Sequence, residues 1–191
     1  MMGLVKRLRN AVRRLRRSET ATAAVEFALI LPVMLFVYVG TLEASTLISM
    51  DRKIQSVTGA VGDLVSRADT TLTASTLTDY FKAASGILTP YPTTDLVQVV
   101  TQVEIKSDGT TRVDWSRQYA NGVLSTSTKY LANTTRKIPP EMINIAKGKY
   151  IIVAESGISY LPLYGIVFKT AIPLYRENYY IPRFGGTITV N

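Results

Sequence analysis

The side chains that most often perform chemistry in proteins are missing from this sequence, because its 191 residues include no His and no Cys. That excludes Ser–His and Cys–His catalysis, disulfides, and zinc or iron–sulfur sites held by Cys. Oxygen-only metal sites, carboxylate chemistry and a Ser–Lys nucleophile pair are compatible with the composition. The carboxylates from residue 63 onward are scattered, however, and no phosphate-binding glycine motif or calcium-loop spacing occurs. We therefore expect no catalytic residue, cofactor or metal.

Glu26 is the carboxylate whose position suggests a function. It directly precedes Phe27–Val39 (FALILPVMLFVYV), thirteen residues without a charge. Extended from Ala23 to Leu42, the apolar segment has twenty residues. At about 1.5 Å per residue these span about 30 Å, the thickness of a membrane's hydrocarbon core. An ionisable residue at such a place is usually functional, and the alternative is that Glu26 merely extends to the membrane surface.

Charge is concentrated before the apolar segment. The first twenty residues hold seven Lys and Arg residues and one acidic residue, a net charge of +6, whereas residues 21–191 carry only +2. A basic stretch that stops where an apolar segment begins indicates a membrane, and we expect no nucleic-acid partner. The positive-inside rule then predicts a cytoplasmic N-terminus, with residues from about 50 onward outside the cytoplasm.

Three kinds of segment share this pattern of a basic head and an apolar run. A secretory signal would be cleaved after the run, near the small residues Ala44 and Ser45. A signal anchor would stay uncleaved. A prepilin-type signal would be cleaved on the cytoplasmic side, before the run. Glu26 favours the third kind, because a carboxylate at the start of an apolar helix serves no purpose in an ordinary signal peptide.

The residues of this segment also resemble a known family. The stretch from Arg16 to Pro32 (RRSETATAAVEFALILP), followed by Gly40 and Glu43, is similar to the N-terminal segment of TadE-like proteins, the minor pseudopilins of the tight-adherence (Tad/Flp) pilus. The resemblance implies cleavage by a prepilin peptidase five residues before the glutamate. The leader would then end at Ala21, where the family commonly has Gly, and the mature chain would begin at Thr22.

The resemblance further implies what this segment does after cleavage. The new ammonium group of Thr22 would pair with the carboxylate of Glu26 in a neighbouring subunit, since both charges are poorly solvated at the membrane edge. Phe27 and Pro32 belong to the same assembly segment. Pro32 removes one backbone donor, so it is either a flexible point used in assembly or a proline that a membrane helix tolerates.

These implications place the chain in the bacterial inner membrane, with one span, a cytoplasmic N-terminus and a periplasmic C-terminal domain. The implied function is structural: assembly or initiation of a Tad (type IVb/IVc-like) pilus used in surface adhesion. Implied partners are the major Flp-type pilin, other minor pseudopilins, the inner-membrane assembly platform and the prepilin peptidase. Whether the protein enters the fibre stays open. The alternatives are an exported periplasmic or extracellular binding protein with a cleaved Sec-type signal and, third, a membrane-tethered hydrolase.

The expected fold is α+β: a pilin-like N-terminal transmembrane helix followed by a domain with an antiparallel sheet. We divide the chain into a leader (1–21), the transmembrane helix and its extension (22–50), and the globular domain (51–191). An apolar stripe should continue the helix and pack on the domain's own core. It consists of Ile54, Val57, Val61, Leu64 and Val65.

The remaining elements follow from alternation and turn residues. A short helix is expected over 75–85, with Tyr80 and Phe81 in the core and Gly86 as its C-cap. Strands at 95–106 and 110–118 should be joined by an Asp-Gly turn, with Trp115 on the sheet face. Further expectations are a polar connection at 119–138, a helix at 140–146, a strand at 150–160 with a bulge at Ser156-Gly157, and alternation over 170–191. Six tyrosines between 150 and 180 suit either a core or a surface near membrane or another subunit.

Overall fold

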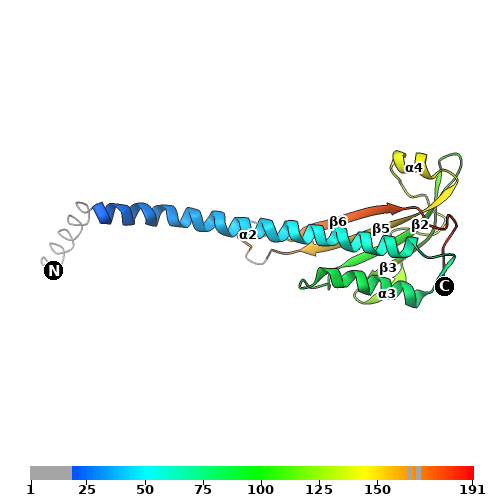
Figure 1. Cartoon of the computed structure of the whole chain (residues 1–191), viewed down its shortest axis with the longest axis horizontal. Coiled ribbons are helices and arrows are strands. Elements are labelled where there is room, and N and C mark those ends of the chain that lie inside the picture. Colours follow the sequence, from blue (N-terminus) through cyan, green and yellow to red (C-terminus); the bar gives the residue numbers. More distant parts are fainter. Residues whose placement is uncertain (1–18, 163–164, 167–168) are drawn as a thin grey trace.

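The longest element of the computed structural model is helix α2, Glu19–Ser66, whose 48 residues extend about 72 Å. Its first part projects away from the rest of the chain, and its second part lies against the body (Figure 1). The structure describes residues 19–162, 165–166 and 169–191. The basic residues from Lys6 to Arg17, and Tyr164, lie outside these described residues.

The body is built on a five-stranded antiparallel sheet with the order β4-β3-β2-β5-β6. Its strands are β2 (Val97–Ile105), β3 (Thr111–Ala120), β4 (Val123–Thr126), β5 (Lys149–Tyr160) and β6 (Ile172–Tyr180). Two short parallel strands, β1 (Thr71–Leu72) and β7 (Thr189–Val190), join the C-terminus to the segment after α2. The α+β class and the antiparallel sheet predicted from the sequence are confirmed.

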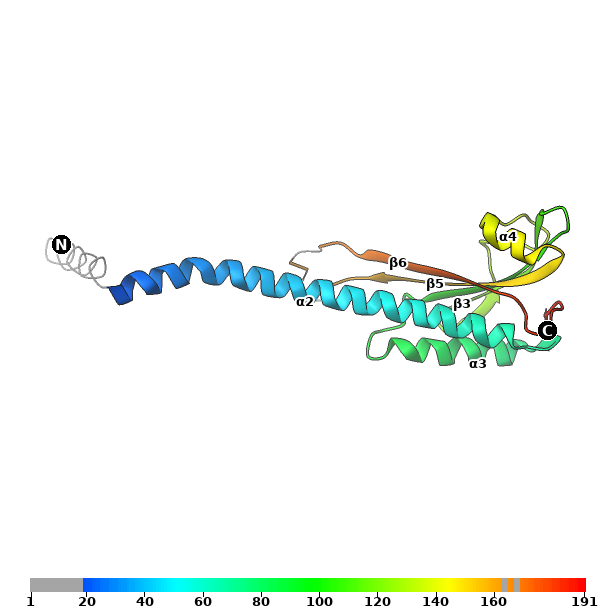
Figure 2. The same cartoon turned by 45° about the horizontal axis from the view of Figure 1, so that its top comes forward.

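The sheet is covered on both faces. Helix α2, helix α3 (Ala74–Ser85) and the 3-10 helix η1 (Gly86–Leu88) lie on one side, and the short helix α4 (Pro140–Ala146) lies on the other (Figure 2). The predicted stripe on α2 is confirmed as core, because four of its members are fully buried and Leu64 is half-buried. The buried members are Ile54, Val57, Val61 and Val65.

Several local predictions are also confirmed. Phe81 is fully buried and Tyr80 packs at the edge of the core. The side chain of Thr73 accepts a hydrogen bond from the Thr76 backbone N–H, so it caps the start of α3. Trp115 is buried on the sheet face, where its Nε1 donates to the carbonyl of Ile188 at 2.6 Å.

The predicted polar connection over 119–138 is wrong in its first part. Strand β3 continues to Ala120, turns through Asn121 and Gly122, and returns as β4. Both turn residues have positive φ angles, 51° and 79°, as a two-residue hairpin requires. Because β4 has only four residues, three of them exposed, it lacks the alternation by which a strand is recognised in sequence.

The bulge predicted at Ser156-Gly157 is also wrong, since β5 keeps one register with both neighbours along its length. The irregularity lies between β2 and β3, where Gln102 and Val103 oppose Trp115 and Val113 and leave Asp114 as the extra residue. A bulge in β5 would disrupt two hydrogen-bonded ladders. At Asp114 β3 pairs with β2 only, since β4 begins its pairing at Arg117.

Candidate assembly helix and the edge of the body beside it

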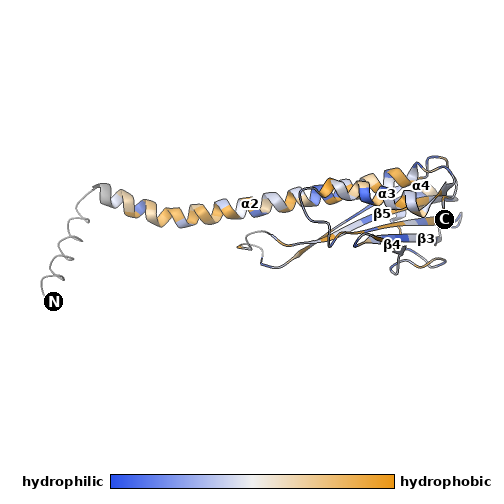
Figure 3. Cartoon of the chain, turned by 90° about the horizontal axis from the view of Figure 1, so that it is seen from below, coloured by the Kyte–Doolittle hydropathy of each residue, from blue (hydrophilic) through white to orange (hydrophobic). Residues whose placement is uncertain are grey.

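The first part of α2 is exposed throughout. Every residue from Thr22 to Tyr38 is exposed, and the large apolar side chains among them are 38–70% exposed. The ribbon coloured by hydropathy is mainly apolar along this part of α2, with a few polar residues between (Figure 3). Within the described residues, Thr22–Ser66 is a helix long and apolar enough by length and composition to cross a membrane. A soluble protein rarely leaves so large an apolar surface uncovered.

Four of the five predicted site residues lie on this exposed part, and the fifth, Ala21, directly precedes it. Thr22, Glu26, Phe27 and Pro32 occupy the first turns of α2, and each is exposed. The predicted cleavage point between Ala21 and Thr22 lies in the first helical turn, because α2 begins at Glu19.

Pro32 does not interrupt the helix, which is continuous from Glu19 to Ser66. A proline at this position has no N–H to donate to the carbonyl four residues earlier, which belongs to Ala28. The interpretation of Pro32 as a flexible point stays a prediction.

Glu43 is a residue whose role the sequence did not reveal. Only 1% of it is exposed, although it lies just beyond the exposed apolar part of α2. Its Oε1 accepts a hydrogen bond from the backbone N–H of Ile166 at 2.9 Å. Ile166 belongs to the connection between β5 and β6, so this contact attaches the far end of that hairpin to α2. The acidic residue was visible in the sequence, but its partner is 123 positions away.

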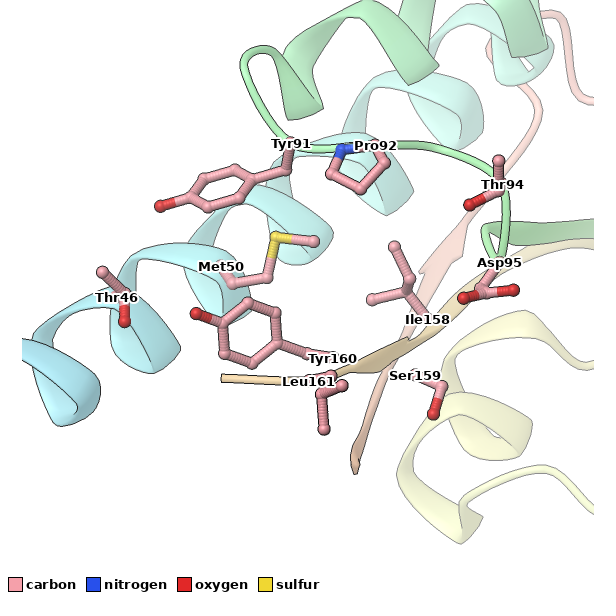
Figure 4. Close-up of a pocket in the computed structure, with 10 residues that line it drawn as sticks. All are labelled: Thr46, Met50, Tyr91, Pro92, Thr94, Asp95, Ile158, Ser159, Tyr160 and Leu161. Carbon is pink, nitrogen blue, oxygen red and sulfur yellow. The ribbon is translucent and has the colours of Figure 1, made fainter. Parts of the chain in front are cut away.

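An apolar pocket of about 390 Å³ opens next to this attachment. Met50 of α2 forms its floor, and Tyr91, Ile158 and Tyr160 close its sides (Figure 4). The remaining lining residues are Thr46, Pro92, Thr94, Asp95, Ser159 and Leu161. Of the six clustered tyrosines, Tyr160 is therefore a core residue that also faces this pocket, whereas Tyr175 is 45% exposed.

A second feature missed by sequence analysis is a buried cluster of charges on the face of the sheet opposite α2. Arg136 and Glu155 are each 3% exposed, and their Nη2 and Oε2 atoms are 3.1 Å apart. Arg136 also donates to Glu177 at 2.7 Å, while Lys129 and Tyr130 donate to Glu155. The cluster fastens the segment between β4 and α4 onto β5 and β6, which is a structural role.

These contacts shift the ionisation of the cluster. Burial alone would raise the pKa of the Glu155 carboxyl, but the charge of Arg136 and hydrogen bonds from Lys129 and Tyr175 outweigh burial and lower that pKa below its ordinary value. Burial, with the hydrogen bond to Glu155, raises the pKa of the Tyr175 hydroxyl. Tyr175 therefore stays protonated and donates to Glu155 at any physiological pH.

Residues 21–61 match the family model described as TadE-like protein. This segment is a TadE-like domain. The match begins at Ala21, beside the predicted cleavage point, and includes Glu26, Pro32 and Glu43. It ends at Val61, in the core of the body, so the TadE-like segment spans both the exposed and the buried part of α2. The resemblance noted in the sequence is confirmed, and it implies a protein associated with the Tad pilus. No curated protein and no solved structure matches the chain.

Proposed function

We propose that this chain is a minor pseudopilin that takes part in the assembly or initiation of a Tad pilus. The observation that supports this most directly is the exposed apolar half of α2 with Glu26 at its start, inside the TadE-like segment. That half spans the inner membrane, and the body lies in the periplasm. The proposed role is structural, with the major pilin, other minor pseudopilins, the assembly platform and the prepilin peptidase as partners.

Glu26 acts in assembly through its charge. Cleavage after Ala21 creates an ammonium group on Thr22 at the cytoplasmic edge of the membrane. An unpaired carboxylate and an unpaired ammonium are both costly where water is scarce. Pairing the carboxylate of one subunit with the ammonium of its neighbour removes this cost in the docked state, so it favours assembly. Phe27, which is 59% exposed beside Glu26, packs against the neighbouring helix.

The alternative of a secretory signal cleaved near Ala44 is less well supported. Ala44 and Ser45 lie in the middle of α2, directly after the buried Glu43 that holds the β5–β6 connection. Cleavage there would sever a continuous helix and detach that contact.

Replacing Glu26 with Ala tests the role of its charge. We expect Glu26→Ala to leave membrane insertion intact and to reduce pilus production at least about tenfold, because a lost interaction of about 1.4 kcal/mol changes an assembly equilibrium tenfold. Glu19→Ala is the matched control, since Glu19 belongs to the leader that is removed. Normal piliation by Glu26→Ala would reject the proposed role, and so would an equal defect in the control.

The mature N-terminus tests the wider proposal. N-terminal sequencing of the membrane form should give Thr22 when the prepilin peptidase is present and the uncleaved chain when it is absent. A start near Ser45 would identify a Sec-type signal and overturn the assignment.

A further inference from the structure

The part of the body that lies nearest to the exposed half of α2 is the connection between β5 and β6, residues 161–171. Its described residue Ile166 contacts α2 at Glu43, which precedes the α2 residues that line the pocket, Thr46 and Met50. The hydrogen bond from the Ile166 N–H to the Glu43 carboxylate attaches it to the helix. Because a buried carboxylate is costly unless it is bonded, this contact stabilises the position of Ile166 against α2.

Helix geometry places this edge relative to a membrane. If Ala23–Leu42 crosses the hydrocarbon core, Glu43 lies at the boundary, and Thr46 and Met50 lie about 5 and 10 Å farther along the axis. The headgroup region is about 5–8 Å thick on each side of the hydrocarbon core. Ile166, which bonds to Glu43, and Thr46, which lines the pocket, therefore lie at the level of the headgroups, and Met50 lies just beyond them.

The side chains at this edge suit that level. Leu161 is 64% exposed and Ile166 is 46% exposed, and neither is covered by another element of the described structure. The pocket beside them is lined mainly by apolar groups, with the rings of Tyr91 and Tyr160 at its sides. Aromatic rings with a hydroxyl group are enriched where membrane and water meet. Lys169 is exposed on the same connection and can approach anionic headgroups.

We propose that this edge is a lipid-binding surface, defined by Leu161, Ile166 and the pocket beside Met50, that rests in the outer headgroup layer of the membrane. The inference depends on the proposed function, since it requires α2 to span the membrane. Lipid is the occupant we assign because the surface continues directly from the apolar half of α2, which already lies in lipid. Contact at a second point, besides the helix, fixes the height and tilt at which the body is presented to its assembly partners.

Single cysteines provide the test, because the natural chain contains none. The full chain with Ile166→Cys or Leu161→Cys carries an environment-sensitive fluorophore and is reconstituted into vesicles of zwitterionic and anionic phospholipid at low protein density. Lipids with a quencher near the headgroup report contact. Ile145→Cys and Phe184→Cys are matched controls, since these residues are 63% and 65% exposed and lie on α4 and after β6, at the far end of the body (Figure 1). Met34→Cys lies near the middle of the apolar segment, so it reports insertion of α2 through lipids that carry the quencher on the acyl chain.

We expect quenching at positions 161 and 166 to exceed that at the two controls at least twofold. If positions 161 and 166 behave like the controls while position 34 is quenched, the inference fails and the membrane-spanning helix stands. If position 34 is also unquenched, both the lipid-binding surface and the membrane-spanning helix are rejected. If the fluorophores at positions 161 and 166 become shielded from water only at high protein density, and without quenching by lipid, the surface binds a second copy of the chain. That result would overturn the lipid assignment.

Glu43→Ala tests the attachment within the same experiment. We expect it to reduce quenching at position 166 and to leave quenching at position 34 unchanged, because only the connection is released. Emission of Trp115, the sole tryptophan, verifies that the core of the variant is intact. Unchanged quenching at position 166 in a folded variant would show that Glu43 does not hold the edge in place, and would reject that part of the inference.

Discussion

At the scale of single residues, Arg136 shows how a buried charge differs from an exposed one. It is 3% exposed and lies between the carboxylates of Glu155 and Glu177. Arg136→Ala would leave Glu155 buried without its main counter-charge, which typically costs about 3–5 kcal/mol. Arg67→Ala is the control, since its pair with Asp63 is exposed and should contribute less than about 1 kcal/mol. Urea unfolding of the detergent-solubilised chain, followed by Trp115 emission, measures both. Equal losses of unfolding free energy in the two variants would contradict the burial of Arg136.

The same cluster predicts how stability depends on pH. The lowered pKa of the Glu155 carboxyl means that its ionised form is favoured in the folded chain. Its stabilising contribution is therefore complete above its ordinary pKa of 4.5 and is lost as the pH falls through the lower folded value. We expect the urea midpoint to fall steeply below about pH 4.5. The glutamine of Glu155→Gln cannot titrate, so the urea midpoint of this variant should fall less steeply at acid pH. The same pH dependence in both proteins would contradict the role assigned to Glu155.

At the scale of elements, the packing of α2 on β6 depends on one glycine. A Cβ added to Gly62 would lie 2.1 Å from a ring carbon of Tyr180 and 3.0 Å from the Ala154 side chain. Gly62→Ala should therefore force α2 away from the sheet and weaken the hydrogen bond from the Tyr180 hydroxyl to the Gly59 carbonyl. We expect a loss of about 1–3 kcal/mol, the usual cost of overpacking a core, in thermal or urea unfolding.

Gly59→Ala is the matched control for that substitution. A Cβ at Gly59 would meet its nearest neighbours, Asn178 and Tyr180, at 3.7 Å, which is ordinary contact. Alanine is also the better helix former by up to about 1 kcal/mol. Gly59→Ala should leave the free energy of unfolding unchanged or raise it. A destabilised Gly59→Ala together with an unaffected Gly62→Ala would contradict the packing described here.

Elements with strong local patterns were predictable from the sequence. The apolar run after Glu26, the stripe that ends at Val65, the helix around Phe81 and the hairpin closed by Asp108-Gly109 all carry their own periodicity or turn residues. The apolar residues that are buried in the helix extension and those exposed before it have similar side chains. Their different environments follow from where the sheet ends, which only the tertiary structure defines.

What was missed depends on partners distant in sequence. Glu43 looks like an ordinary acidic residue until Ile166 is brought to it across 123 positions. Arg136 sits in a polar connection that resembles a solvated loop, and its burial follows only when that connection folds over β5. We predicted a bulge in β5, whereas the structure has it at Asp114 of β3. Which strand tolerates a bulge depends on how many neighbouring strands it pairs with, and the sequence of one strand does not contain that information.

At the scale of the whole molecule, one helix serves two environments. Residues 22–38 of α2 are exposed and contribute nothing to the core of the body, while five apolar residues later in the helix are fully or almost fully buried there. These are Met50, Ile54, Val57, Val61 and Val65. We therefore expect the body to fold without the membrane segment but not without the end of the same helix.

Two fragments test this division. Residues 45–191 retain every buried apolar residue of the core and should fold as a soluble domain with native Trp115 emission and a cooperative unfolding transition. Residues 67–191 lack five buried side chains, each contributing about 1.5–3 kcal/mol. The combined loss of about 8–15 kcal/mol equals the whole stability of an ordinary domain, so this fragment should remain unfolded. Circular dichroism and Trp115 emission distinguish the outcomes. A folded 67–191 fragment would mean that α2 lies against the body without forming its core.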